Sequence, residues 1–121
     1  MQRPAGDIGD DAPLRGREPI DLAHLRRCTA GDDVLGQEII ALFHRNASAT
    51  VVRIAAAGDA EERRQASHSL KGSALAVGAW EVARLASAVE VAADDAEAVA
   101  RYVGALRRAL ERTRSFAERL S

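Results

Sequence analysis

The sequence predicts an all-α fold, an antiparallel up-and-down four-helix bundle with a short extra N-terminal helix. Apolar residues make up 47% of the 121 residues but aromatic residues only 3%, so the core must consist of Ala, Val, Leu and Ile. Alanine is the best helix former, and small side chains let helices approach closely. Apolar residues also recur at spacings of three and four along four long segments, which is the period of one buried helix face.

Residues 1–19 are predicted to be a disordered tail, and residues 20–121 to be the folded domain. The tail contains all three prolines and three of the nine glycines, without a helical or strand period. A docking role for the tail is the alternative, but no apolar cluster is present to anchor it. A short helical segment follows, from Ile20 to about Cys28.

The first long helix is expected to begin at a cap on Asp32 or Asp33 and to close at Gly58. The apolar positions that define its buried face are Ile39, Ile40, Phe43, Ala47, Val51 and Ile54.

The next helix is expected from about Ala60 to Val77, where Gly78 stops it. Asp59, followed three residues later by Glu62, resembles a capping box at its start.

Two further helices complete the predicted bundle. The shorter one begins at Ala79, and Asp94 with Glu97 three residues later predicts a cap for the last helix. The apolar positions are Val82, Leu85, Ala86 and Val89 on the shorter helix, and Val99, Val103, Leu106, Leu110, Thr113, Ala117 and Leu120 on the last. Very short turns between long amphipathic helices favour antiparallel neighbours.

Composition excludes several classes of protein. The formal net charge of −1 argues against a nucleic-acid binder that works by neutralising phosphates. No apolar run approaches the ~20 residues that span a bilayer, and no secretion signal is seen, so a cytoplasmic location is expected. Cys28 is the single cysteine, which rules out an internal disulfide. No metal-site pattern joins Cys28 to His24 or His44, and neither a metal nor a cofactor is predicted.

His68 lies in the middle of the 60–77 helix. At about 100° per residue, a small and largely apolar stripe falls opposite it and is predicted to be buried. That stripe consists of Ala66, Leu70, Ser73 and Val77. His68 is therefore expected to face solvent, and an idle surface histidine is the alternative interpretation.

The neighbours of His68 on its helix face are unusual. Arg64 and Lys71 lie four residues before and three after it, and Lys71 is the single lysine among 17 basic residues. These cations could hold a negative group attached to the imidazole, although a solvated helix surface would look the same. A glycine inside a helix lowers helix stability by ~1 kcal/mol relative to alanine, and at position 72 it leaves room beside the ring. Leu75, almost in line with His68, is a candidate for a docking patch.

These residues belong to a longer pattern. It contains the run Ala66-Ser67-His68-Ser69-Leu70-Lys71-Gly72-Ser73-Ala74, then Gly78-Ala79, Val82, Leu85, Val89 and Glu90. The pattern resembles the signature of the histidine-containing phosphotransfer (HPt) domain family, and the resemblance covers about residues 20–120. Ser67 replaces a frequent alanine, and Val82 and Val89 replace leucines, which are differences of packing.

The resemblance implies that His68 is the phosphorylated residue, that Lys71 assists with the phosphate and that Gly72 leaves space. It implies partners, namely response-regulator receiver domains or a hybrid sensor histidine kinase, with Mg²⁺ on the receiver and no cofactor on this chain. A carrier of this kind is not an enzyme, and no ATP-binding segment is present. Docking is expected to centre on Arg64, Gly72 and Leu75, with the protein a monomer.

Two other functions are compatible with the sequence. One is an adaptor bundle that binds a receiver or kinase without carrying phosphate. The other is the phosphoacceptor module of a chemotaxis-type kinase, against which the lack of a downstream kinase segment argues. Ser69 and Ser73 lack the orienting acid and oxyanion hole of a serine nucleophile. Trp80 is expected to be half-buried in the core rather than part of a partner rim.

Overall fold

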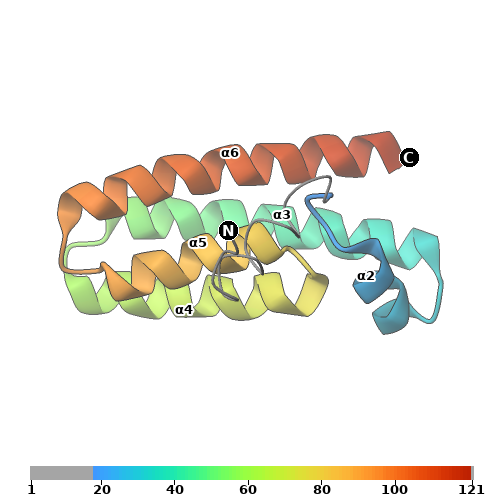
Figure 1. The fold of residues 1–121 in the computed structure, drawn as a ribbon, viewed down its shortest axis with the longest axis horizontal. Coiled ribbons are helices and arrows are strands. Elements are labelled where there is room, and N and C mark those ends of the chain that lie inside the picture. Colours follow the sequence, from blue (N-terminus) through green and yellow to red (C-terminus); the bar gives the residue numbers. More distant parts are fainter. Residues whose placement is uncertain (1–17, 121) are drawn as a thin grey trace, which may run out of the picture.

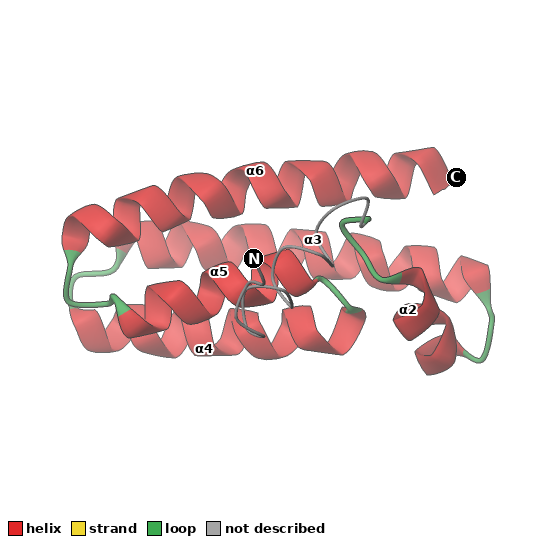
Figure 2. Cartoon of the chain, in the orientation of Figure 1, coloured by secondary structure: helices red, strands yellow, loops and turns green. Residues whose placement is uncertain are grey.

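The computed structural model describes residues 18–120, which form five α-helices and no strand (Figure 2). The helices are α2 (Leu22–Thr29), α3 (Asp33–Ala56), α4 (Ala60–Val77), α5 (Trp80–Val91) and α6 (Ala96–Leu120). The all-α prediction is confirmed for this part of the chain. Apart from Glu18 and Pro19, the predicted tail lies outside the described residues.

The four longer helices lie side by side (Figure 1). Each packs on the next along the chain, and α6 also packs on α3, so the contacts close into a ring around one core. The short helix α2 packs against α3 at one end of the molecule. None of the described helices has the length and hydropathy needed to cross a membrane.

The core consists of aliphatic side chains and two buried phenylalanines, Phe43 and Phe116. The largest hydrophobic side chains that are fully buried are Ile20, Ile40, Ile54, Leu70, Leu106, Val82 and Val89. Every long helix contributes to this set, because each presents an apolar stripe at the three-and-four spacing. Ile20 is completely buried, so the folded domain begins before the first helix.

Two of the predicted helix caps are present as expected. The side chain of Asp32 accepts a hydrogen bond from the backbone N–H of Leu35 at 3.0 Å. Asp59 accepts one from the N–H of Glu62 at 2.8 Å, and Glu62 accepts one from the N–H of Gly58 at 3.0 Å. Each cap satisfies N–H groups that the first helical turn leaves unpaired.

The predicted cap of the last helix is wrong by one residue. The carboxylate that accepts the N–H of Ala98, at 3.1 Å, belongs to Asp95 and not to Asp94. A capping side chain reaches the N–H three residues ahead, so the start of α6 at Ala96 selects Asp95. Asp94 instead pairs with Arg64 of α4.

The buried stripe of α4 also differs from the prediction. Ser73 is exposed, and the buried residues are Ala66, Ser67, Leu70, Ala74 and Val77. The stripe is rotated because α4 packs against both α3 and α5, which brings Ser67 and Ala74 inside. The Ser67 hydroxyl donates to the backbone oxygen of Arg63 at 2.8 Å, so its burial leaves no polar group unpaired.

A polar clamp holds α2 to the turn between α4 and α5. The Trp80 indole N–H donates to the Asp21 carboxylate at 3.0 Å, and the Asp21 backbone N–H donates to the Gly78 oxygen at 2.9 Å. The His24 Nε2 lies 3.1 Å from the backbone oxygen of Ala76. Trp80 is half-buried, as predicted, and its ring meets His24 edge-on at 5.1 Å between centroids.

Candidate functional site

His68 lies at the middle of α4 with its ring in solvent. Its side chain is 70% exposed, as the helix wheel predicts. Leu70 and Ser67 anchor the opposite side of the same helical turns in the core. The ring is therefore presented to an approaching molecule while its backbone is held rigidly.

Glu90 of α5 contacts the His68 ring. The Glu90 Oε2 lies 3.1 Å from the His68 Nδ1. A carboxylate oxygen only accepts, so we assign the ring hydrogen to Nδ1, which leaves the Nε2 lone pair pointing away from Glu90. Among the residues that the structure describes, none bonds to that Nε2. Sequence reasoning placed Glu90 in a family pattern but missed this contact.

Lys71 forms an ion pair with the second oxygen of the Glu90 carboxylate. Its Nζ lies 3.9 Å from the Glu90 Oε1, and its side chain is 34% exposed. Glu90 therefore lies between the imidazole and the ammonium group and holds both on one face. The arrangement places the positive charge of Lys71 on the same carboxylate that contacts the exposed His68 ring.

The guanidinium of Arg64 does not point at His68. It forms ion pairs with Glu61 at 3.3 Å and with Asp94 at 3.5 Å. Helix spacing alone grouped Arg64 with His68, but spacing does not decide which of two nearby carboxylates a long side chain meets. Of the two predicted charged neighbours of His68, Arg64 and Lys71, the structure joins only Lys71 to the ring, through Glu90.

Gly72 and Leu75 lie on the exposed side of α4. A Cβ placed on Gly72 would meet nothing within 4 Å, so no close helix crossing requires glycine there. Leu75 is 45% exposed. Gly72 therefore faces open space, and Leu75 presents part of an apolar side chain to solvent.

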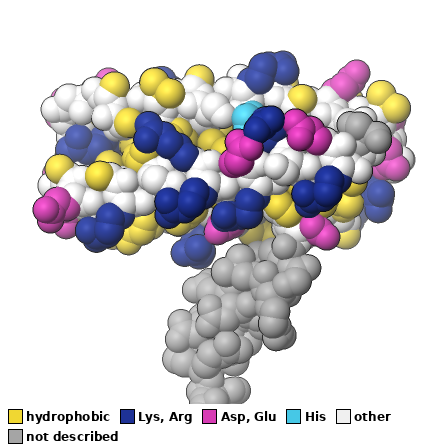
Figure 3. Space-filling view, turned by 90° about the horizontal axis from the view of Figure 1, so that it is seen from above, with side chains coloured by type: hydrophobic (Ala, Val, Ile, Leu, Met, Phe, Trp, Pro, Cys, Tyr) yellow, Lys and Arg dark blue, Asp and Glu magenta, His cyan; other side chains and the backbone are white. Residues whose placement is uncertain are grey.

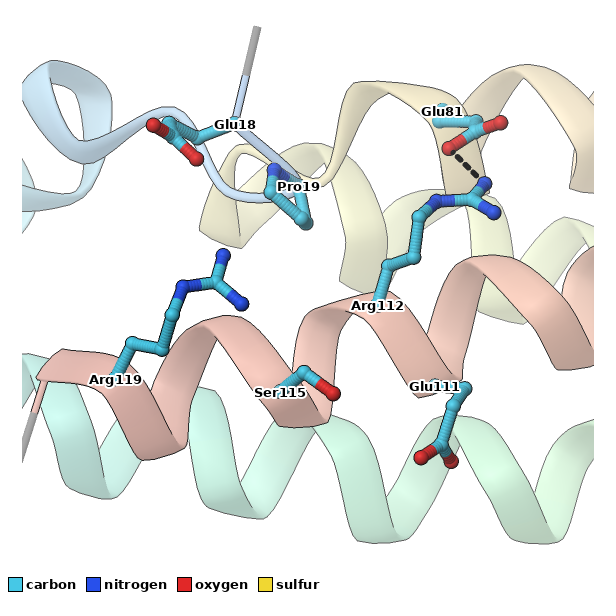
Figure 4. Close-up of a pocket in the computed structure, with 7 residues that line it drawn as sticks. All are labelled: Glu18, Pro19, Glu81, Glu111, Arg112, Ser115 and Arg119. Carbon is cyan, nitrogen blue, oxygen red and sulfur yellow. Dashed lines mark hydrogen bonds and ion pairs between the residues drawn. The ribbon is translucent and has the colours of Figure 1, made fainter.

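A cavity of about 520 Å³ lies elsewhere, between α6, the start of α5 and Glu18–Pro19 (Figure 4). Arg112 in its wall pairs with Glu81 at 2.6 Å. The wall also carries two more carboxylates, those of Glu18 and Glu111. No residue of α4 lines this cavity, so it does not belong to the histidine site.

His24 and Cys28 share a face of α2, a pairing that sequence reasoning missed. They are four residues apart, and the Cys28 Sγ lies 3.9 Å from the His24 Nε2. Within residues 18–120 no group of three or more His, Cys, Asp or Glu side chains could hold a metal ion.

The model of the family described as "Hpt domain" matches residues 35–116, which is well over half of the chain. The chain belongs to the Hpt domain family. Hpt domains are phosphotransfer carriers of two-component signalling, and they interact with receiver domains and kinases in phosphorelays. The comparisons with curated proteins and with solved structures found no match.

Proposed function

We propose that this protein is a cytoplasmic histidine phosphotransfer protein that accepts a phosphoryl group on His68 from a receiver-domain aspartate and passes it to another. The observation that carries the proposal is the exposed His68 ring whose Nδ1 is occupied by Glu90. For the fold, we propose the antiparallel up-and-down four-helix bundle that the sequence predicts. The closed circle of contacts among α3, α4, α5 and α6 supports it.

The nucleophile in this proposal is the Nε2 of His68. With the hydrogen on Nδ1, Nε2 carries a lone pair in the plane of the ring and faces solvent. Nε2 attacks the phosphorus of a receiver's aspartyl phosphate, a N–P bond forms and the P–O bond to the aspartate breaks. The electron pair of the broken bond leaves on the aspartate carboxylate, and the reverse step returns the phosphoryl group.

Charge compensation comes from two sides. As Nε2 bonds to phosphorus the ring becomes positive, and the Glu90 carboxylate at Nδ1 stabilises that charge. The negative phosphoryl oxygens require a cation, which Lys71 supplies from its place beside Glu90. Arg64 would first have to leave Glu61 and Asp94, exposed ion pairs worth about 0–1 kcal/mol.

The partner is proposed to dock on the exposed side of α4. Gly72 leaves open space for the phosphoryl group, and Leu75 supplies apolar contact. In this proposal the chain supplies the His68 nucleophile and the Lys71 cation, and the acidic pocket of the receiver is the proposed place for Mg²⁺ and the remaining catalytic groups. No cofactor on this chain enters the proposed step.

The experiment is phosphoryl exchange with purified, phosphorylated receivers. The full chain should acquire an acid-labile label, and His68→Gln should abolish it. His24→Gln and His44→Gln are matched controls that should keep the label. Label retained in His68→Gln would overturn the site. Binding to a receiver without label from any donor would instead support the adaptor function.

Docking is tested by two substitutions on α4. Leu75→Asp should slow transfer by about tenfold, the size of one lost apolar contact of about 1.4 kcal/mol, while helicity stays unchanged. Gly72→Gln should slow transfer by crowding. Val91→Asp, at a position on α5 that is 88% exposed, is the control and should transfer normally. Unchanged rates for Leu75→Asp would mean that the patch lies elsewhere.

A further inference from the structure

Helix α3 is apolar on the side that faces away from the bundle. Six large hydrophobic residues of the described chain are exposed, and four of them are on α3. They are Val34, Leu35, Leu42 and Val52, with 68%, 40%, 49% and 61% of their surface exposed. Single exposed leucines are ordinary, but a continuous apolar stripe on one helix indicates a contact surface.

The stripe has the spacing of a helix–helix seam. Leu35, Leu42, Ala49 and Ala56 follow one another at intervals of seven residues, and all are exposed. The buried side of α3, with Ile40 among its residues, is already used by the core. The stripe is therefore additional to what the bundle needs.

Helix α6 shows what an outward face of this bundle normally looks like. Its exposed side carries arginines, and Figure 3, which looks onto the side where α6 lies, shows many Lys and Arg side chains there. The exposed arginines of this side are Arg101, Arg108, Arg112 and Arg119. The apolar face of α3 is thus not a general property of the molecule.

Charged residues also lie on the exposed face of α3, among them Glu38, Arg45 and Arg53, and the first two have opposite signs. Glu38 and Arg45 are seven residues apart and both are exposed. Neither forms an ion pair with any other residue that the structure describes. One carboxylate and one guanidinium, one heptad apart and unpaired, are complementary to the same two groups on a helix that runs in the opposite direction.

In place of the monomer expected from the sequence, we propose that the α3 stripe binds the α3 stripe of a second copy of this chain, with the two helices antiparallel. A two-fold axis passing between Ala41 and Leu42 places Glu38 of each copy opposite Arg45 of the other. The axis creates two ion pairs and brings the two Leu42 side chains together at the centre. A two-fold contact must be self-complementary, and this stripe meets that condition in both charge and apolarity.

The position of the reactive histidine favours a second copy over a receiver as the occupant. His68 and Lys71 both bind Glu90 of α5, so the reactive face is turned toward α5. Helix α3 packs on another side of α4. A dimer through α3 therefore leaves the His68 ring accessible in both copies.

The test measures self-association of the full chain by sedimentation equilibrium from about 1 µM to about 1 mM, a range that covers weak interfaces. The wild-type chain should shift from monomer to dimer. Leu42→Lys should weaken the dimer at least about tenfold, because it buries an unpaired charge at the centre. Val91→Lys is the control on α5 and should associate like the wild type. A wild-type chain that stays monomeric throughout would overturn the proposal.

Charge reversal tests the register. Glu38→Arg and Arg45→Glu should each weaken self-association about tenfold, since each places like charges opposite one another. An equimolar mixture of the two variants should recover dimers, because both cross-pairs are then attractive. No recovery in the mixture would contradict the proposed register. Unchanged mass together with slower phosphoryl transfer in Leu42→Lys would assign the stripe to a receiver and overturn the dimer.

Discussion

The molecule uses two histidines in opposite ways. On α4, the Nδ1 of His68 meets Glu90 at 3.1 Å, and its Nε2 faces solvent. On α2, the Nε2 of His24 lies 3.1 Å from the backbone oxygen of Ala76, and its ring lies against Trp80. Both rings join two elements of the fold, but through different nitrogens: His68 through Nδ1 to a carboxylate, and His24 through Nε2 to a backbone oxygen.

The comparison shows that the reactivity of a histidine depends on which of its ring nitrogens is hydrogen-bonded within the fold, and to which group. A nucleophile needs an unoccupied lone pair and an orienting partner on the other nitrogen. Glu90 gives His68 that arrangement across the α4–α5 contact. The His24 ring, which contacts the Ala76 backbone and the Trp80 ring and forms no hydrogen bond to a carboxylate within residues 18–120, works as a structural contact that helps to hold α2.

The largest expected effect comes from removing the ring that packs on His24. Trp80→Ala should lower the free energy of unfolding by about 2–3 kcal/mol, because a half-buried indole and its hydrogen bond to Asp21 are lost. Urea denaturation followed by circular dichroism measures this. Phosphoryl transfer to His68 should persist below the transition. Loss of transfer in a fully folded variant would show that the two histidine regions are coupled.

The next largest effect on stability concerns Gly78, in the turn between α4 and α5. Gly78 has a φ of +85°, and an added Cβ would lie 3.2 Å from the Cβ of Asp21 and from the Cδ2 of His24. Gly78→Ala should therefore cost about 2 kcal/mol of stability. Gly72→Ala is the matched control beside His68, where a Cβ meets nothing within 4 Å. It should raise stability by up to ~1 kcal/mol, and equal losses in both variants would contradict the comparison.

Glu90→Gln sharpens the comparison on the reactive side. The neutral amide no longer compensates a positive ring or selects the hydrogen on Nδ1, so transfer should slow about tenfold, or ~1.4 kcal/mol in the barrier. Stability should stay within about 0.5 kcal/mol of the wild type. Rates come from single-turnover exchange, with Glu81→Gln on the same helix as control. A wild-type rate would remove Glu90 from the proposed step.

The smallest effect is the pH dependence of the clamp. The pKa of the Asp21 carboxyl lies below its unfolded value of 3.8, mainly because the backbone N–H of His24 donates to it and the Trp80 indole adds a second bond. A lowered pKa stabilises the fold above about pH 4, and that stability is lost as the pH falls through the folded pKa. Asp21→Asn should therefore flatten the acid limb of unfolding curves recorded from pH 5 to 2. If Asp21→Asn loses stability between pH 5 and 2 as the wild type does, other carboxylates cause that loss.

Much of the fold follows from local signals that the sequence carries. The capping pair Asp59–Glu62 and the stop at Gly78 predicted the bounds of α4, and the structure has both. Local signals do not fix a helix boundary where two capping residues are adjacent. Asp94 and Asp95 are neighbours in the sequence, and the start of α6 makes Asp95 the cap. Ser73 and Ser67 exchanged places for a similar reason, since a helix with two neighbours buries a rotated stripe.

The sequence by itself determined the five helical segments and an exposed His68, because propensity, capping and periodicity act over a few residues. Only the tertiary structure decided that Glu90, 22 residues away, orients the ring and that Arg64 turns to Asp94. Contacts of this kind depend on how α4 and α5 are rotated against each other. That rotation is set by the packing of the whole core, which no short stretch of sequence specifies.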